Sequence, residues 1–177
     1  MNKNLLKMGI TVAIFCAAAG AYVGNKRLQP KTPVDGAVQQ LISLNLKDNK
    51  GQVQALKQWQ GKFLVVNFWA TWCKPCVQEM PELAALQTEL SNKNVQLLGI
   101  GIDTPSNISE FAEKYKITYP VFAAGLEGTD LATSMGNQAG GLPYTALVNQ
   151  EGKIVKTYMG KLKMDELRAD IQKYNIQ

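Results

Sequence analysis

Two cysteines three residues apart are the side chains of this sequence whose spacing is suited to chemistry. Cys73 and Cys76 enclose Lys74 and Pro75, directly after an apolar run. Two thiols at the start of a helix can close a disulfide within one turn, and the positive end of the helix dipole favours a thiolate at the first of them. Pro75 suits a first helical turn, and Lys74 adds positive charge near the thiolate. The pattern predicts thiol–disulfide exchange, with Cys73 as the attacking, more exposed thiol and Cys76 as the resolving thiol.

The absence of histidine excludes several other reactions. None of the 177 residues is a histidine, so Ser-His-Asp and Cys-His catalysis and Cys2His2 zinc sites are ruled out. A zinc site at Cys73 and Cys76 would need two further Cys or His ligands, and the only other cysteine is Cys16. Two thiolates can bind Cu(I), so a Cu(I) chaperone or metal-site assembly factor stays open as the alternative function. For thiol exchange we expect no metal, flavin or nucleotide cofactor.

The positive charge lies almost entirely at the amino terminus. The net charge is +5, and hydrophobic residues make up 46% of the chain, which is an ordinary globular composition. Four of the 19 basic residues and no acidic residue fall within residues 1–27, which leaves 15 basic and 14 acidic residues in the remainder. A nearly neutral body argues against nucleic acid as a partner.

The first residues have the pattern of an export signal. Residues 8–24 are uncharged and follow two lysines, and their length is at the short limit for a membrane-spanning helix. The triplet Ala-Gly-Ala at residues 19–21 resembles a signal-peptide cleavage site. We therefore expect residues 1–27 to be either a membrane anchor or a cleaved signal peptide. Both interpretations place the protein in the periplasm or at the extracytoplasmic face of a membrane, either anchored there or secreted.

The rest of the chain is expected to be a linker and one domain. Residues 28–37 contain Pro30 and Pro33, which discourage a helix, and residues 38–177 are predicted to fold as a unit. From hydrophobic periodicity and turn residues we expect an N-terminal β extension (41–46 and 51–55), strands at 63–69, 95–102 and 121–122, a hairpin of 144–149 with 154–158, and helices at 74–90, 106–115 (capped by Ser106 or Asn107), 130–135 and 164–174. This order predicts an α/β fold in which helices flank a mixed central sheet.

The segment around the cysteines resembles a known family. Residues 67–76 (NFWATWCKPC) are similar to the active-site segment of thioredoxin-fold proteins. The pattern C-x-x-C-x-x-E-x-P, which ends at Pro81, resembles the extracytoplasmic, membrane-tethered thiol–disulfide oxidoreductases of the TlpA/ResA-like branch. Residues 140–143 (GGLP), followed by an apolar strand and QEGK at 150–153, match the cis-proline region of that branch. The resemblance covers about residues 38–175 and implies a thioredoxin-like fold.

The resemblance also implies roles near the substrate. It implies that Pro143 is a cis-proline that faces the disulfide and that the backbone of Leu142 pairs with an extended segment of the substrate. Trp72 is expected to shield one side of Cys73, whereas Trp69 is expected in the core.

A proton acceptor is implied as well. Glu79 corresponds to the acidic residue of the family near the cysteines and is a candidate proton acceptor for Cys76, because residues 73, 76 and 79 share one helical face. The alternative is that Glu79 is a solvated helix glutamate. Asn67 stands where thioredoxin has a buried aspartate, so Glu79 or water would have to take the proton.

The expected partners follow from the same resemblance. The family implies a disulfide-containing client protein, which is reduced, and a membrane thiol–reductant donor that restores the dithiol. The opposite direction, in which the protein donates its disulfide, stays open, because no sequence rule gives the reduction potential. The client itself is not identified by the sequence.

Overall fold

The computed structural model describes residues 33–175. The predicted anchor or signal at residues 1–27 lies outside the described residues. Within residues 33–175, no helix combines the length and the apolar character needed to cross a membrane.

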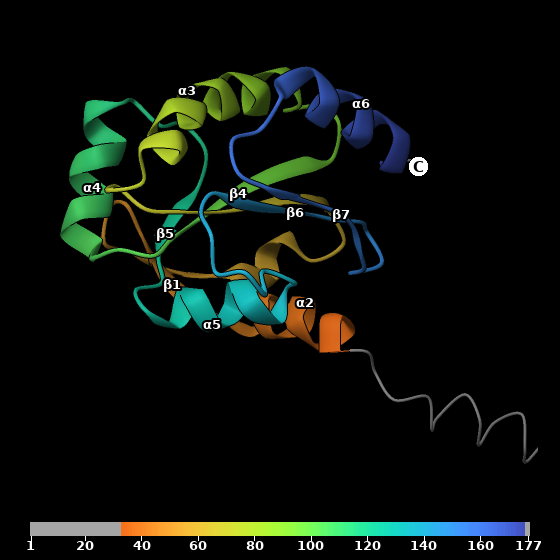
Figure 1. Ribbon diagram of the computed structural model, residues 1–177, viewed down its shortest axis with the longest axis horizontal. Coiled ribbons are helices and arrows are strands. Elements are labelled where there is room, and N and C mark those ends of the chain that lie inside the picture. Colours follow the sequence, from red (N-terminus) through yellow and green to blue (C-terminus); the bar gives the residue numbers. More distant parts are fainter. Residues whose placement is uncertain (1–32, 176–177) are drawn as a thin grey trace, which may run out of the picture. The chain divides into compact units, whose positions relative to one another are not determined.

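One mixed sheet of seven strands forms the centre of the domain (Figure 1). Its strands, in the spatial order β2-β1-β5-β4-β3-β6-β7, are β1 (Asn45–Asp48), β2 (Val53–Ala55), β3 (Phe63–Trp69), β4 (Val95–Gly101), β5 (Val121–Ala123), β6 (Tyr144–Val148) and β7 (Ile154–Met159). Strands β3, β4 and β5 are parallel, and the other neighbours are antiparallel. The carboxyl ends of β3, β4 and β5 therefore share one edge, and the polypeptide that follows β3 carries the two cysteines.

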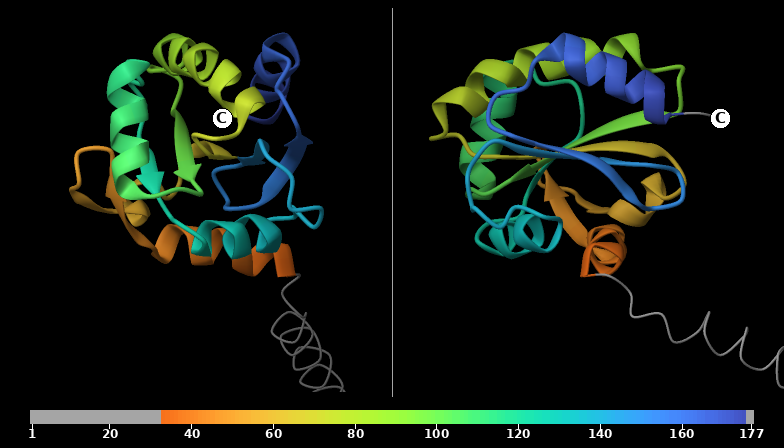
Figure 2. Two further views of the ribbon diagram at one scale, coloured as in Figure 1. Left: turned by 60° about the vertical axis from the view of Figure 1, so that its left-hand side comes forward. Right: turned by 45° about the vertical axis from the view of Figure 1, so that its right-hand side comes forward.

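Helices cover both faces of the sheet, as Figures 1 and 2 show. They are α2 (Pro33–Ser43), the 3-10 helix η1 (Leu56–Trp59), α3 (Lys74–Glu89), α4 (Pro105–Lys114), α5 (Glu127–Ser134) and α6 (Met164–Tyr174). Side chains of α3, α4 and α6 form one apolar cluster with the sheet, and those of α2, η1 and α5 form another. The expected α/β architecture is thus confirmed.

Strand β3 divides its side chains between the two clusters. All seven of its residues are buried. Phe63, Val65 and Trp69 pack on the side of α3, whereas Leu64 and Phe68 pack on the side of α2. Successive side chains of a strand point to opposite faces, so Asn67 faces α3 together with Val65 and Trp69, which lie two residues before and after it. A polar side chain is thereby placed in the core beneath the cysteine-bearing helix.

The amino-terminal part of the domain differs from the prediction. Residues 41–43, which we expected in a strand, belong to helix α2, and residues 33–37 of the expected linker form its first turns. Pro33 occupies the first helical position. The backbone N–H of this position has no partner within a helix, so the missing N–H of proline costs nothing there and Pro33 starts the helix instead of breaking it. The expected β extension is real only from Asn45 onward, as the antiparallel pair β1–β2. The prediction that Ser106 or Asn107 caps α4 was also wrong. The N-cap is Thr104, whose hydroxyl accepts a hydrogen bond from the backbone N–H of Asn107.

Candidate active site

The two cysteines are joined in a disulfide at the beginning of α3. Cys73 is the N-cap residue of this helix, and the backbone N–H of Cys76 points at its Sγ atom over 3.3 Å. Cys73 is 6% exposed, whereas Cys76 is completely buried. In the reduced protein, the same N–H group and the helix dipole would stabilise a thiolate on Cys73. The less buried of the two cysteines is therefore the one whose sulfur lies at the start of the helix.

Glu79 lies one helical turn beyond Cys76 and has no exposed surface. Its Oε1 atom accepts a hydrogen bond from Asn67 Nδ2 over 2.9 Å, and its Oε2 atom accepts one from the backbone N–H of Leu162, also over 2.9 Å. Burial raises the pKa of Glu79 to about 7, although these two hydrogen bonds and the charge of Lys161 act in the opposite direction. The alternative of a solvated helix glutamate is excluded by this burial. A carboxyl with such a pKa can both accept and release a proton near neutral pH.

Asn67 connects Glu79 with the strand that follows the cis-proline. Its amide nitrogen donates one bond to Glu79 and a second, over 3.0 Å, to the hydroxyl of Thr145 in β6. Both acceptors are far from Asn67 in the sequence, and all three residues are buried. The amide thus does more than stand in for an aspartate, because it orients the carboxyl of Glu79. The sequence contained no signal for this contact beyond the polar residue within an apolar strand.

The Leu142–Pro143 peptide bond is cis, as expected. Tyr144 pairs with Phe68 near the end of β3, so Pro143 lies at the edge of the sheet from which the active-site loop departs. The carbonyl of Pro143 accepts a bond from Gly160 N–H over 2.9 Å. Within residues 33–175, neither the N–H nor the C=O of Leu142 is bonded to another protein group. Its backbone is thus free to pair with an extended segment of another chain.

The remaining predicted site residues surround Cys73 at the surface. Trp72 is 70% exposed, Lys74 is exposed, and Pro75 lies in the first turn of α3. Trp72 and Lys74 border a groove of about 610 Å³ between the start of α3 and helix α4, with Phe111 on its far side. An exposed indole beside the reactive sulfur provides a large apolar contact for a protein partner. Trp69 is fully buried, as expected.

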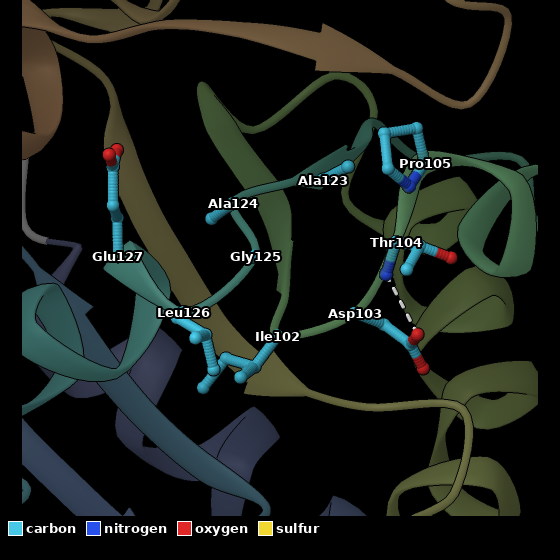
Figure 3. A pocket seen from close by; sticks show the side chains of 9 residues that line it. All are labelled: Ile102, Asp103, Thr104, Pro105, Ala123, Ala124, Gly125, Leu126 and Glu127. Atoms are coloured by element: carbon cyan, nitrogen blue, oxygen red, sulfur yellow. Dashed lines mark hydrogen bonds between the residues drawn. The ribbon is translucent and has the colours of Figure 1, made fainter.

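Asp103, which the sequence analysis did not single out, holds the loop that precedes Cys73. Its carboxylate accepts hydrogen bonds from the backbone N–H and the hydroxyl of Thr71, and from Asn107 Nδ2. Although burial opposes it, this set of donors holds the pKa of Asp103 below its usual value. Figure 3 shows Asp103 beside a pocket of about 660 Å³ at the carboxyl ends of β4 and β5, where Ile102 and the exposed Leu126 also lie. In the sequence, the only indication of a role for Asp103 was its position directly after the predicted buried strand.

No metal site accompanies these residues in the described part of the chain. Across residues 33–175, no three Cys, Asp or Glu side chains are grouped so that they could hold an ion.

The chain is similar to known thiol–disulfide oxidoreductases. The Redoxin family model matches residues 31–173. The thiol-disulfide oxidoreductase ResA of Bacillus cereus is 30% identical over 177 residues, which cover 98% of both chains. ResA of Bacillus anthracis is 32% identical over 181 residues, again 98% of both chains.

Solved structures show the same fold. A thiol:disulfide interchange protein of the thioredoxin family from Chlorobium tepidum TLS superimposes with a TM-score of 0.68 at 22% identity, over 76% of this chain and 94% of that one. A putative thioredoxin from Neisseria meningitidis gives a TM-score of 0.63 at 27% identity, over 74% of this chain and 86% of that one. The domain thus has a thioredoxin-like fold. With its C-x-x-C disulfide, the family match and the nearly full-length relatives, the chain belongs to the Redoxin family and is a ResA-like thiol–disulfide oxidoreductase.

Proposed function

We propose that the protein reduces disulfide bonds of client proteins outside the cytoplasm through the dithiol of Cys73 and Cys76. The observation that carries this proposal is the asymmetry of the pair. Cys73 caps the start of α3 and keeps 6% of its surface exposed, whereas Cys76, one turn inside, is completely buried. Such an arrangement suits an attacking and a resolving thiol.

In the first step, the Cys73 thiolate attacks one sulfur of the client disulfide. A bond forms between Cys73 Sγ and that sulfur, and the second client sulfur leaves as a thiolate that takes a proton from water. The extended client segment pairs with the free backbone groups of Leu142, beside Pro143. The exposed side chain of Trp72, which borders the groove between α3 and α4, offers the client an apolar contact next to Cys73 in the sequence.

In the second step, Cys76 resolves the mixed disulfide. The carboxylate of Glu79 takes the proton of the Cys76 thiol, and the resulting thiolate attacks Cys73 Sγ. The intramolecular disulfide forms, the bond between Cys73 Sγ and the attacked client sulfur breaks, and that sulfur leaves as a thiolate. Two electrons have then passed from the protein to the client. The disulfide in the structure corresponds to this product state. A second thiol donor must then return two electrons and two protons, and we propose a membrane thiol–reductant donor for this step.

Trapping tests the order of attack. Cys76→Ser should accumulate mixed disulfides through Cys73, visible as adducts on non-reducing gels that disappear with reductant. Cys73→Ser should accumulate none and should lose turnover. Turnover at the wild-type rate by either variant would contradict the mechanism, and adducts formed through Cys76 alone would reverse the roles of the two thiols.

The reduction potential of the full chain tests the direction of electron flow. Equilibration with defined thiol buffers should give a value near that of thioredoxin, about −270 mV, as a reductant in an oxidising compartment requires. A value near about −120 mV would instead identify a disulfide donor. The two outcomes are well separated, so the measurement decides between reductase and oxidant.

The extracytoplasmic location rests on the sequence of residues 1–27, which lie outside the described residues. Their charged start and apolar stretch support membrane association, by an anchor or during export. Fractionation of cells that express the full chain should find it in the membrane fraction, resistant to alkaline extraction, if the segment is retained. A shorter protein in the soluble extracytoplasmic fraction would show cleavage, and recovery from the cytoplasm would contradict the location.

A further inference from the structure

The loop that carries the cis-proline contains several glycines and no regular structure. Residues 135–143 connect helix α5 with strand β6 (Figure 1), and this stretch includes Gly136, Gly140 and Gly141. Gly136 and Gly140 have φ angles of 113° and 66°, which other residues rarely adopt. Glycine also leaves a loop many accessible conformations, so specific contacts must select the one that presents Leu142 and Pro143 to a client.

Asn137 makes such contacts from inside the loop. It is 3% exposed, and its backbone N–H is anchored to the carbonyl of Ala132 at the end of α5, over 2.9 Å. Its side-chain Nδ2 atom donates to the carbonyl of Gly141 over 2.9 Å, and its own carbonyl accepts from Gly140 N–H over 3.2 Å. The side chain thus closes the loop across four residues, and the backbone N–H of the same residue ties the loop to a helix that packs on the sheet.

The bond to Gly141 also determines how Leu142 is presented. The Gly141 carbonyl and the Leu142 N–H belong to the same peptide group, which is planar and trans, so they point in opposite directions. Fixing the carbonyl toward Asn137 therefore directs the Leu142 N–H away from it. On the other side, the Pro143 carbonyl is fixed by Gly160 N–H. The peptide group before Leu142 is held through the Gly141 carbonyl, and the peptide group after Pro143 is held through the Pro143 carbonyl. The free N–H and C=O of Leu142 lie between these two anchored carbonyls.

We propose that Asn137 is a positioning residue for client binding, which orients the backbone of Leu142 for pairing with an extended segment of the client beside its disulfide. The inference rests on the proposed function, because it concerns the same client. It requires a hydrogen-bond donor at this position, since the Gly141 carbonyl can only accept. Asn137 touches neither sulfur, so its contribution should appear in substrate binding and not in the sulfur chemistry.

The test compares two disulfides with the reduced full-length protein. One is a synthetic peptide with two extended segments joined by a disulfide, and the other is 5,5′-dithiobis(2-nitrobenzoate), which has no peptide backbone. Asn137→Ala should lower kcat/KM for the peptide about tenfold, mostly through KM, because backbone hydrogen bonds to the bound segment weaken. The rate with the small disulfide should stay within about twofold of the wild type, since the sulfur chemistry is unchanged.

Asn149 provides the matched control. Its Oδ1 atom accepts a bond from Lys153 N–H over 2.9 Å and pins the turn between β6 and β7, so Asn149→Ala also removes one side-chain bond to a loop backbone. This variant should leave both rates unchanged. Asn137→Asp is the second variant, because it keeps the size of the side chain but replaces the donor by an acceptor. It should repeat the loss on the peptide, even if Asn137→Ala folds poorly.

The outcomes separate this inference from the function on which it rests. If the wild type reduces the peptide and both Asn137 variants do so equally fast, the positioning role is wrong and the proposed function stands. An equal loss on the peptide and on the small disulfide, or an equal loss in Asn149→Ala, would also contradict it, because a general loss of structure would then explain the result. If the wild type reacts with the small disulfide but not with the peptide, both the proposed function and this inference fail.

Discussion

The side-chain amide of Asn67 donates a hydrogen bond to Glu79 Oε1 over 2.9 Å within the buried core between β3 and α3. The contact joins a strand residue to the carboxyl that lies one turn beyond Cys76. Glu79 is held a second time by the N–H of Leu162. The two hydrogen bonds hold this fully buried carboxyl in one orientation. They also oppose the effect of burial, so its pKa is about 7.

Glu79→Gln should slow the resolving step. In the wild type, the rate should rise with pH through about 7, because the carboxyl must be ionised to take the proton of Cys76. The variant has no titrating group at this position, so its rate should be about a hundredfold lower near neutral pH and should lack this inflection. The measurement is the rate of client release from the mixed disulfide between about pH 5 and about pH 9.

Glu82→Gln is the control for this change, because Glu82 lies on the same helix but is exposed. The Glu82 charge is the smallest of the influences that raise the pKa of Glu79, so this variant should keep the inflection of the wild-type pH–rate profile, moved at most slightly to lower pH. If the Glu79 variant also keeps the wild-type profile, Glu79 is not the proton acceptor.

Asn67→Leu should raise the pKa of Glu79 above about 7. Hydrogen bonds to a carboxylate stabilise its charged form, and leucine has a similar volume but no donor. Infrared absorption of the protonated carboxyl, followed against pH in the oxidised protein, measures the shift directly. Thr145→Val removes the other acceptor of Asn67 and leaves the bond to Glu79, so the pKa of Glu79 should not move in that variant. A downward shift in Asn67→Leu would show that the amide does not stabilise the carboxylate.

The stability of the wild type should fall relative to Glu79→Gln as pH rises between about 4.5 and about 7. The pKa of Glu79 is raised on folding, so the native state binds more protons than the unfolded state in this range, and the free energy of unfolding decreases with pH. A shift from 4.5 to about 7 corresponds to about 3 kcal/mol in the difference between the two proteins. Urea denaturation of both oxidised proteins at several pH values measures that difference. A difference that is constant with pH would contradict the raised pKa.

Two glycine substitutions should have opposite effects on stability. A Cβ at Gly36, within helix α2, meets no atom within 4 Å, so Gly36→Ala should stabilise the fold by about 0.5–1 kcal/mol. A Cβ at Gly99 would lie 2.7 Å from Val121 Cγ1 and 3.1 Å from Trp69 Nε1, so Gly99→Ala should cost about 1–3 kcal/mol. Thermal unfolding compares both variants with the wild type. Equal effects of the two would show that the region around Gly99 rearranges freely.

The sequence predicted the elements that carry a strong local pattern. The buried run of β3, the helix after the cysteines and the closing hairpin and helix all lie where the periodicity placed them. Helix α2 was missed because Pro33 was interpreted as a helix breaker and because a few leucines in alternation also fit a strand. In fact Ala37, Val38, Leu41 and Ile42 form the buried side of a helix.

The contacts that organise the site could not be predicted in the same way. Asn67 meets Thr145 from 78 positions away, and Leu162 meets Glu79 from 83 positions away. Such contacts depend on the tertiary packing of the sheet, which no local pattern contains. Asn137 differs, since it meets Gly141 only four residues away, but its proposed role depends on the neighbouring Leu142, whose free backbone groups only the structure shows.

The ends of the sheet affect how the molecule behaves toward other chains. At one end, the edge strand β2 has only three residues. At the other end, β7 has an irregular register against β6 and carries Lys156 among its residues. Short edges, bulges and lysines are the devices by which proteins prevent strands of neighbouring molecules from adding to their sheets. If Leu142 binds an extended client segment as proposed, the protected sheet edges limit self-association and leave the backbone of Leu142 as the place where another chain makes strand-like contact.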